Sequence, residues 1–230
     1  YHCDVLIIGG GISGLYAAEL AAKANLKVLL LEQNSTLGGE INNGRNLETK
    51  LNTKDVIENV ELKLFNEIYS NLKKFPNIKI VKNTSVFAYM HYNYLLACQK
   101  NNKNIRQIIW KIRAKKVILA TGSIERPLTF NNNDRPGIML SHSARKYANR
   151  NIILGKNIVL FTNNDYAYQA AIDFKLLDSS IKVTVIDIRN NSNGDLVKEA
   201  KNLDVKVLFN HVITNTKGRK KINSVFVHKI

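Results

Sequence analysis

The stretch Ile7–Leu15, "IIGGGISGL", decides the fold, because it joins an apolar segment to a helical one through a cluster of glycines. Residues 4–8 are apolar and rich in strand formers, while "GLYAAELAAKAN" (14–25) is typical of a helix. The apolar run "KVLLLE" (27–32) then predicts a second buried strand. Strand, glycine turn, helix and strand within about thirty residues form a βαβ unit. The sequence therefore predicts an α/β fold.

The glycines of this turn follow the spacing G-x-G-x-x-G at Gly9, Gly11 and Gly14. The first allows a tight turn, the second lets a pyrophosphate approach the backbone, and the third lets helix pack on strand. Ile12 and Ser13 open the helix, where free N–H groups and the helix dipole favour an anion. We therefore predict an FAD/NAD(P)-binding Rossmann-like domain that holds an adenine dinucleotide at this loop.

An acidic residue, Glu32, ends the second strand eighteen residues after the last glycine of the motif. A carboxylate there accepts hydrogen bonds from ribose hydroxyls and repels a 2′-phosphate, which favours NAD or FAD over NADP. Gln33 stands beside it, and Gly38-Gly39 offers a second backbone approach to the pyrophosphate. We count all four residues as cofactor-binding candidates. These arguments leave both NAD and FAD open.

A later apolar run, "KKVILATGS" (115–123), predicts another buried strand that ends in a turn. Ligands of such sheets bind at the carboxyl ends of the strands. The turn residues Ala120, Thr121 and Gly122 therefore join the cofactor-binding candidates.

Between these segments, residues 54–74 predict an amphipathic helix and residues 77–81 a strand. The apolar stripe of that helix consists of Val56, Val60, Leu64, Ile68 and Leu72. Residues at about 84–114 alternate like an antiparallel β-meander. We assign residues 1–127 to a dinucleotide-binding domain that contains this meander.

The strand and helix pattern restarts in residues 128–230, which we assign to a second, nested Rossmann-like domain. Its first strand ends in Thr162-Asn163-Asn164-Asp165 instead of a glycine loop. We interpret Asp165 as a helix N-cap whose charge repels phosphate. We therefore expect this domain to bind no nucleotide. We also expect the chain to be a piece of a longer protein, truncated at the C-terminal end of this domain.

Composition narrows the possible functions. The two cysteines, Cys3 and Cys98, form no C-x-x-C pair, and the five histidines are scattered, so we predict neither disulfide chemistry nor a metal site. Two thiols without a disulfide framework suggest a cytoplasmic setting. No apolar run is long enough for a membrane span, and we expect no membrane association.

The net charge of +16 is divided evenly between the two halves of the chain. Eleven Lys or Arg residues and no acids lie between Glu67 and Glu125. A solvated basic surface explains this run, and an acidic partner surface is the alternative. We expect no nucleic-acid partner. A non-catalytic basic interaction module, whose binding would depend strongly on salt, stays open as an alternative function.

The order glycine loop, acid, Gly-Gly, meander and Ala-Thr-Gly resembles the flavoproteins with two dinucleotide-binding domains. Residues 110–150 and 159–171, above all "IERP" (124–127) and "NDRPG" (133–137), closely resemble the alpha subunits of heterotetrameric sarcosine oxidases. The same runs occur in the related subunits of hydrogen cyanide synthase and opine oxidases. The similarity covers nearly the whole chain, but only the dinucleotide-binding part of those subunits.

This resemblance implies that the first domain holds NAD rather than FAD and that the backbone near Val86 flanks the adenine. It further implies an oxidoreductase acting on CH–NH groups, which oxidises sarcosine to glycine with oxygen, gives hydrogen peroxide and passes a one-carbon unit to tetrahydrofolate. FMN and tetrahydrofolate would bind elsewhere in a complex with beta, gamma and delta subunits. We expect the chain alone to be inactive. A freestanding FAD-dependent pyridine-nucleotide oxidoreductase is the alternative.

No catalytic residue can be assigned from the sequence. Glu125, Arg126, Asp134 and Arg135 cluster at the predicted domain junction. They fit a subunit-interface or cofactor-edge site, and they fit equally well Arg–carboxylate pairs that tie the two domains together.

Overall fold

The computed structural model describes residues 1–43, 60–100, 105–150, 152 and 154–230. The described residues form two compact units. Unit 1 contains Tyr1–Asn42 and 60–123, and unit 2 contains Asn43 and Ile124–Ile230. Within the described ranges no helix combines the length and the apolarity that crossing a lipid bilayer requires.

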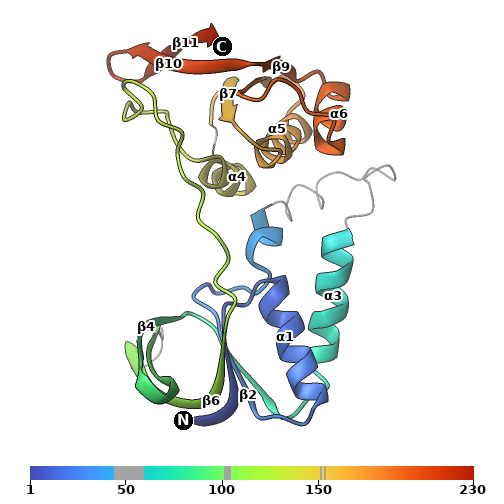
Figure 1. Cartoon of the computed structure of the whole chain (residues 1–230), viewed down its shortest axis with the longest axis vertical. Coiled ribbons are helices and arrows are strands. Elements are labelled where there is room, and N and C mark those ends of the chain that lie inside the picture. Colours follow the sequence, from blue (N-terminus) through green and yellow to red (C-terminus); the bar gives the residue numbers. More distant parts are fainter. Residues whose placement is uncertain (44–59, 101–104, 151, 153) are drawn as a thin grey trace. The chain divides into compact units, whose positions relative to one another are not determined.

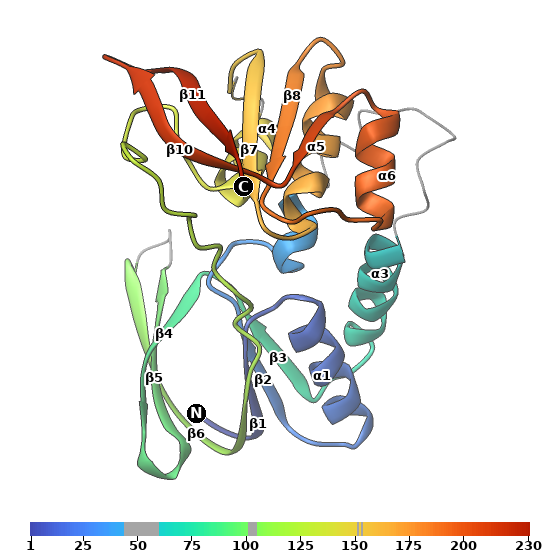
Figure 2. The same ribbon diagram turned by 45° about the horizontal axis from the view of Figure 1, so that its top comes forward.

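Unit 1 is built on a six-stranded sheet with the order β3-β2-β1-β6-β5-β4 (Figures 1 and 2). Strands β1, β2, β3 and the C-terminal half of β6 run parallel, whereas β4, β5 and β6 pair antiparallel as a meander. The strands are β1 (His2–Ile8), β2 (Val28–Leu31), β3 (Ile78–Val81), β4 (Thr84–Met90), β5 (Tyr94–Lys100) and β6 (Gln107–Leu119). The predicted Rossmann-like fold with an inserted meander is confirmed.

The antiparallel pairing of β6 ends at Arg113, close to the predicted end of the meander, but no separate strand begins after it. We expected the meander to end at about residue 114 and a separate strand to begin at 115, but β6 runs unbroken over both. No glycine or proline interrupts Gln107–Leu119. Arg113 pairs with Tyr94 on one side and with His2 on the other. One long strand therefore joins the meander to the parallel sheet.

Two helices, α1 (Ile12–Lys23) and α3 (Val60–Leu72), lie side by side on one face of this sheet (Figure 1). Their core contains Leu15, Phe65, Ile68 and Leu72, packed on alternate residues of β1 and β2. Short 3₁₀ helices follow at η1 (Gly39–Asn43) and η2 (His91–Asn93).

The buried stripe of α3 differs from the predicted one. Ile68 and Leu72 are buried as expected, but Leu64 is 40% exposed and Phe65 takes its place at 4%. A four-residue step advances 400° around a helix with 100° per residue, so the stripe drifts by about 40° at each step. Val56 lies outside the described residues, and the side chain of Val60 is likewise not described.

Unit 2 contains a parallel sheet of β7 (Asn157–Thr162), β8 (Lys182–Asp187) and β9 (Lys206–Phe209). Helices α4 (Ser141–Asn149), α5 (Tyr166–Leu177) and α6 (Asp195–Asn202) share a hydrophobic core with this sheet. A hairpin of β10 (His211–Gly218) and β11 (Ile222–Lys229) follows. The β7–α5–β8 segment is a second βαβ unit of Rossmann type.

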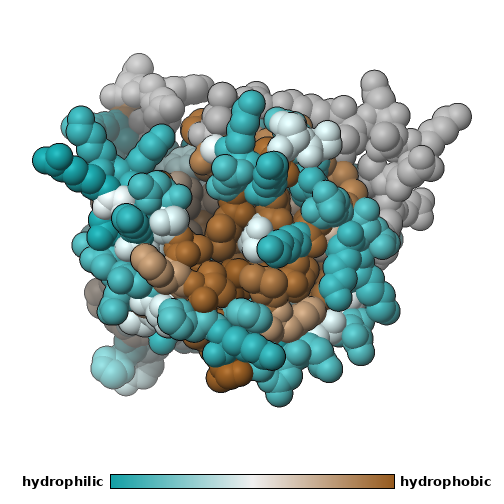
Figure 3. Space-filling model, turned by 90° about the horizontal axis from the view of Figure 1, so that it is seen from above, coloured by the Kyte–Doolittle hydropathy of each residue, from teal (hydrophilic) through white to brown (hydrophobic). Residues whose placement is uncertain are grey.

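An apolar groove of about 490 Å³ lies in unit 2. Phe161 at the end of β7, Ile188 just after β8, Phe130 and Val212 line it, with polar groups from Asn131 and its neighbours. Hydrophobic side chains gather at the centre of the face that carries β10 and β11, and hydrophilic ones surround them (Figure 3).

Candidate functional site

The glycine loop of unit 1 joins β1 to α1 and is shaped by contacts that only glycine permits. Gly9 has φ +108°, and a Cβ there would lie 2.2 Å from the Ala120 carbonyl oxygen. A Cβ on Gly14 would lie 1.9 Å from the Gly9 carbonyl oxygen. The loop, the start of α1 and the end of β6 are therefore in backbone contact.

Gly11 differs from its neighbours because its missing Cβ points into open space. Of the residues that the structure describes, none other than Gly11 and its two chain neighbours has an atom within 4 Å of that position, and the φ of −73° is one that any residue adopts. Gly11 is also the N-cap of α1, so no side chain caps the N–H groups of the first turn. Ser13, in that turn, is exposed. This is the cradle that an anionic group needs at a helix N-terminus.

Glu32 faces the same loop from the position just after β2. Its carboxylate accepts hydrogen bonds from Gly10 N–H at 2.7 Å, Asn34 N–H at 2.7 Å and Asn34 Nδ2 at 2.9 Å. A carboxylate has about four lone-pair positions, so these three donors leave one for a ligand hydroxyl. Glu32 is 5% exposed, and the side chains of Gln33 and Asn34 beside it are uncharged.

The predicted Gly-Gly pair lies directly against the glycine loop. Gly38 N–H donates to the Gly10 carbonyl at 2.8 Å, and Gly38 forms a parallel β-bridge with Gly11. A Cβ on Gly39 would lie 3.2 Å from the Gly11 Cα. The structure thus brings together two glycine segments that are about 27 residues apart in the sequence.

The Ala-Thr-Gly turn ends β6 next to the same loop. Ala120 N–H donates to the Ile8 carbonyl at 2.8 Å, and Thr121 and Gly122 are exposed at this edge. Val86 lies on β4 and is half-buried. It follows Thr84, whose N–H donates to the Glu32 carbonyl oxygen at 2.8 Å. All predicted cofactor-binding residues therefore lie in unit 1, at or near the carboxyl ends of β1, β2 and β6.

Two residues of this site were not predicted. Leu37 is buried, and its Cδ2 lies 2.6 Å from the place of a Cβ on Gly10. Asn34 holds the carboxylate of Glu32 through both its backbone and its side chain. The sequence could have indicated Asn34, because Asn readily forms hydrogen bonds with a residue two positions away in the chain, here Glu32.

The cluster at the predicted domain junction forms contacts other than Arg–carboxylate pairs. Glu125 accepts hydrogen bonds from Ser141 Oγ at 2.7 Å and from His142 N–H at 2.9 Å, so it caps α4. Arg135 donates to the Gly218 carbonyl oxygen. Arg126 and Asp134 are exposed. The contacts of Glu125 and Arg135 thus stabilise unit 2.

The interpretation of Asp165 as a helix N-cap is half right. It occupies the N-cap position of α5, but its side chain makes no capping hydrogen bond. Asn164 accepts the hydrogen bond from Tyr166 N–H at 2.9 Å instead, and Asp165 forms an ion pair with Arg189 at 2.7 Å. A carboxylate beside a guanidinium is stabilised more by this ion pair than by a hydrogen bond to a backbone N–H at the helix start.

Both cysteines are free thiols in different strands of unit 1. Burial, with a smaller contribution from the nearby Asp4 carboxylate, raises the pKa of the Cys3 thiol to about 11. A thiol at this pKa is almost entirely protonated at neutral pH and is a poor nucleophile. In the described part of the chain no three acidic, histidine or cysteine side chains gather closely enough to hold a metal ion.

Comparisons with known proteins agree with this geometry. The sequence model of the family described as pyridine nucleotide-disulphide oxidoreductase matches residues 3–229. Sarcosine oxidase subunit alpha of Corynebacterium sp. (strain U-96) is 34% identical over 94% of this chain and 22% of its own length. The subunit of the same name from Rhizobium meliloti (strain 1021) is 30% identical over 99% of this chain and 22% of its own length. The predicted resemblance is confirmed, and the chain spans less than a quarter of these relatives.

Solved structures show the same fold. Thioredoxin reductase of T. acidophilum superposes with a TM-score of 0.68 at 21% identity, covering 98% of this chain and 70% of the reductase. L-proline dehydrogenase of P. horikoshii superposes with a TM-score of 0.62 at 23% identity, covering 100% of this chain and 40% of the dehydrogenase. At these identities the likeness establishes the fold alone.

Proposed function

The chain belongs to the pyridine nucleotide-disulphide oxidoreductase family, and from this premise we propose a function for unit 1. Unit 1 binds NAD, as the dinucleotide-binding region of a sarcosine oxidase alpha subunit. The observation that carries the proposal is the open space at Gly11 over the uncapped N-terminus of α1, with Glu32 facing the same loop. The similarity to sarcosine oxidase alpha subunits supports the choice of NAD over FAD.

Each part of the site has a role in this proposal. The backbone at Gly11, Ile12 and Ser13 would bind the pyrophosphate, and Gly38-Gly39 lies against this loop. Glu32 would accept a hydrogen bond from a ribose hydroxyl at its remaining lone pair, while Asn34 holds the carboxylate in place.

The remaining candidates line the edge of this cradle. Gln33 would lie next to the ribose, and the backbone near Val86 would flank the adenine. The exposed turn residues Thr121 and Gly122, with Ala120, would border the distal part of the dinucleotide. Bound NAD would supply a nicotinamide ring able to accept or donate a hydride.

At the level of the full assembly, we propose an oxidoreductase that converts sarcosine to glycine with oxygen and transfers a one-carbon unit to tetrahydrofolate. The chain would act there with beta, gamma and delta subunits, which together with the rest of the alpha subunit would carry FMN and the folate site. The resemblance to the sarcosine oxidase subunits supports this assignment. The chain alone then binds a dinucleotide without performing the oxidation.

The test is to denature the purified protein and to identify any released nucleotide by absorbance and mass. If none is released, NAD and FAD are added to the folded protein and their binding is measured by calorimetry. Release or saturable binding of NAD, without flavin, is the expected result. Release of FAD would instead indicate a freestanding flavoenzyme, and failure to bind either nucleotide would contradict the proposal.

The matched control is Gly11→Leu, because this side chain enters the open space of the loop, where no non-neighbouring residue that the structure describes lies within 4 Å of its Cβ. We expect the variant to fold like the wild type and to lose the nucleotide.

A further inference from the structure

Unit 2 repeats the geometry of a nucleotide-binding βαβ unit. The loop 163–165 joins the carboxyl end of β7 to α5, and Asp187 ends β8 much as Glu32 follows β2 in unit 1. Ligands of such sheets bind at this edge, and the family's description names a pyridine nucleotide. The question is whether the residues present fit that ligand.

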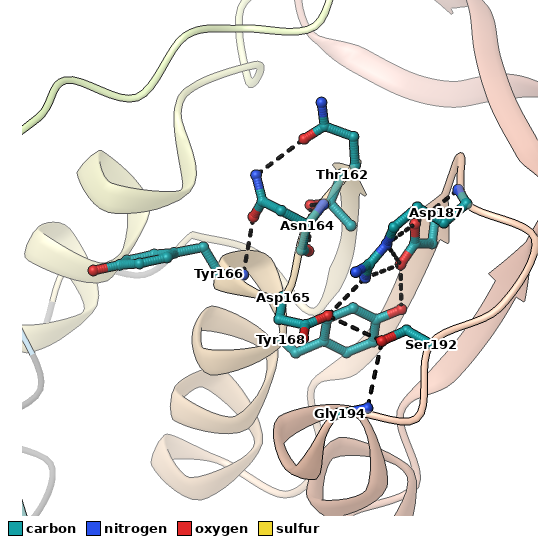
Figure 4. A network of polar contacts seen from close by, with 10 residues as sticks. Thr162, Asn164, Asp165, Tyr166, Tyr168, Asp187, Ser192 and Gly194 are labelled. Carbon is teal, nitrogen blue, oxygen red and sulfur yellow. Dashed lines mark hydrogen bonds and ion pairs between the residues drawn. The ribbon is translucent and has the colours of Figure 1, made fainter.

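The loop between β7 and α5 offers no cradle of the kind seen at Gly11. Thr162 Oγ1 donates to the Asn164 carbonyl at 2.8 Å and accepts from Asn164 N–H at 3.1 Å. Asn164 Oδ1 accepts from Tyr166 N–H at 2.9 Å, as Figure 4 shows. The first N–H of α5, that of Tyr166, is therefore already bound by a side chain of the protein, and side chains stand where a pyrophosphate would need bare backbone.

Arg189 fills the space between the two carboxylates of this edge. Its Nη2 lies 2.7 Å from Asp165 Oδ1 and 2.7 Å from Asp187 Oδ2. Ser192 Oγ also donates to Asp165 Oδ1, at 3.2 Å (Figure 4). One positive and two negative charges leave this edge with a net negative charge, which repels a pyrophosphate.

Asp187 has no lone pair left for a ribose. Its Oδ1 accepts from Arg189 N–H and Nε, both at 3.0 Å, and its Oδ2 accepts from Arg189 Nη2 at 2.7 Å and from Tyr168 Oη at 2.8 Å. These four donors use all four positions of the carboxylate, which is 0% exposed. The carboxylate of Glu32, in contrast, accepts only three hydrogen bonds from the described residues.

We propose that unit 2 is a self-occupied dinucleotide fold, in which Arg189 takes the place of the ligand and neither NAD(H) nor NADP(H) binds. The chain then holds one dinucleotide, in unit 1. A free pyridine nucleotide can exchange a hydride with a partner only through unit 1 or through another subunit. The inference is independent of which dinucleotide unit 1 holds.

The binding test uses NADH and NADPH as probes on the wild-type chain and on Gly11→Leu, with calorimetric titration up to millimolar concentration. We expect at most one site in the wild type and none in Gly11→Leu. Saturable binding of either probe to Gly11→Leu would overturn the proposal. If the folded wild type binds neither probe nor FAD, unit 2 still behaves as proposed, and the assignment of unit 1 is the one that fails.

A second test examines Arg189 itself. Arg189→Ala leaves the buried Asp187 carboxylate without its cation, so we expect the melting temperature of unit 2 to fall by about 4 °C or more. Adding Asp187→Asn to that variant removes the uncompensated charge and should restore much of the loss. The matched control is Lys198→Ala, which breaks an exposed ion pair with Asp195 and should shift the melting temperature by about 1 °C or less. Arg189→Ala melting like the control would contradict the role of Arg189.

Discussion

Some glycines of the β1–α1 loop are needed for the fold, and another leaves space for a ligand. Gly9 and Gly14 are required by contacts with backbone atoms of the protein itself, whereas the space beside Gly11 is open among the residues that the structure describes. The same motif therefore contains two positions where a side chain would disturb the fold and one where it would disturb only a ligand. This distinction allows the site to be tested without unfolding it.

Gly14→Ala should destabilise unit 1, because its Cβ would overlap the Gly9 carbonyl oxygen. We expect a loss of about 1–3 kcal/mol in the free energy of unfolding, measured by urea denaturation. Gly11→Ala is the control and should change the stability by less than about 0.5 kcal/mol, because the reduced freedom of the unfolded chain offsets the poorer N-cap. Equal losses in both variants would contradict this division of roles.

Acid should weaken unit 2 through Asp187. Burial alone would raise the pKa of this carboxyl, but the hydrogen bonds from Arg189 and Tyr168 outweigh it and hold the pKa below the usual range. The unfolded chain therefore takes up the proton at a higher pH than the folded chain. The stabilisation is present above about pH 3.9 and is lost as the pH falls further.

The measurement is denaturant unfolding of the wild type and of Asp187→Asn between pH 3 and pH 6. The variant should lose less stability on acidification than the wild type does. If both proteins show the same dependence on pH, the carboxylate does not have a lowered pKa.

At the scale of elements, α3 packs on α1 through a stripe of buried apolar side chains that winds slowly around the axis of α3. Leu72 is 3% exposed and Leu64 is 40% exposed on the same helix. We expect Leu72→Ala to cost about 2–5 kcal/mol of unfolding free energy, and Leu64→Ala to stay within about 0.5 kcal/mol of the wild type. Urea denaturation of both variants checks this. Similar costs for both would mean that the originally predicted stripe is the buried one.

The N-terminus of α4 depends on a residue sixteen positions earlier. Glu125 accepts hydrogen bonds from both Ser141 and His142, so it satisfies two N–H groups that would otherwise lack a partner. Glu125→Ala should lower the stability of unit 2 by about 0.5–2 kcal/mol. Arg126→Ala, next in the chain and exposed, is the control and should change it little. A loss confined to Arg126→Ala would refute the capping role.

At the scale of the whole molecule, each unit has its own hydrophobic core within the described residues. If unit 1 alone binds a dinucleotide, NAD should raise the melting transition of unit 1 and leave that of unit 2 unchanged. A concentration one hundred times the Kd stabilises the binding unit by about 2.7 kcal/mol. Scanning calorimetry with and without NAD measures this, and an upward shift of the unit 2 transition would count against the assignment.

The sequence by itself determined the βαβ start, the glycine motif, the acid after β2 and the restart of the pattern in the second half. These features are local, because a glycine spacing or an apolar period depends on neighbours along the chain. The candidates Gly9 to Glu32 could therefore be predicted without coordinates. The meander and the change of pairing partner near residue 114 were predictable, but the continuity of β6 through that change was not, since it depends on partner strands that are distant in the sequence.

Only the tertiary structure decided which polar groups are already in use. Glu32 and Asp187 both stand at the carboxyl end of an apolar strand and look alike in the sequence, yet one retains a lone pair and the other is enclosed by Arg189 and Tyr168. The drift of the α3 stripe from Leu64 to Phe65 and the cap that Glu125 provides are of the same kind. Such features depend on partners that are distant in sequence, and folding alone brings them within hydrogen-bonding or packing distance.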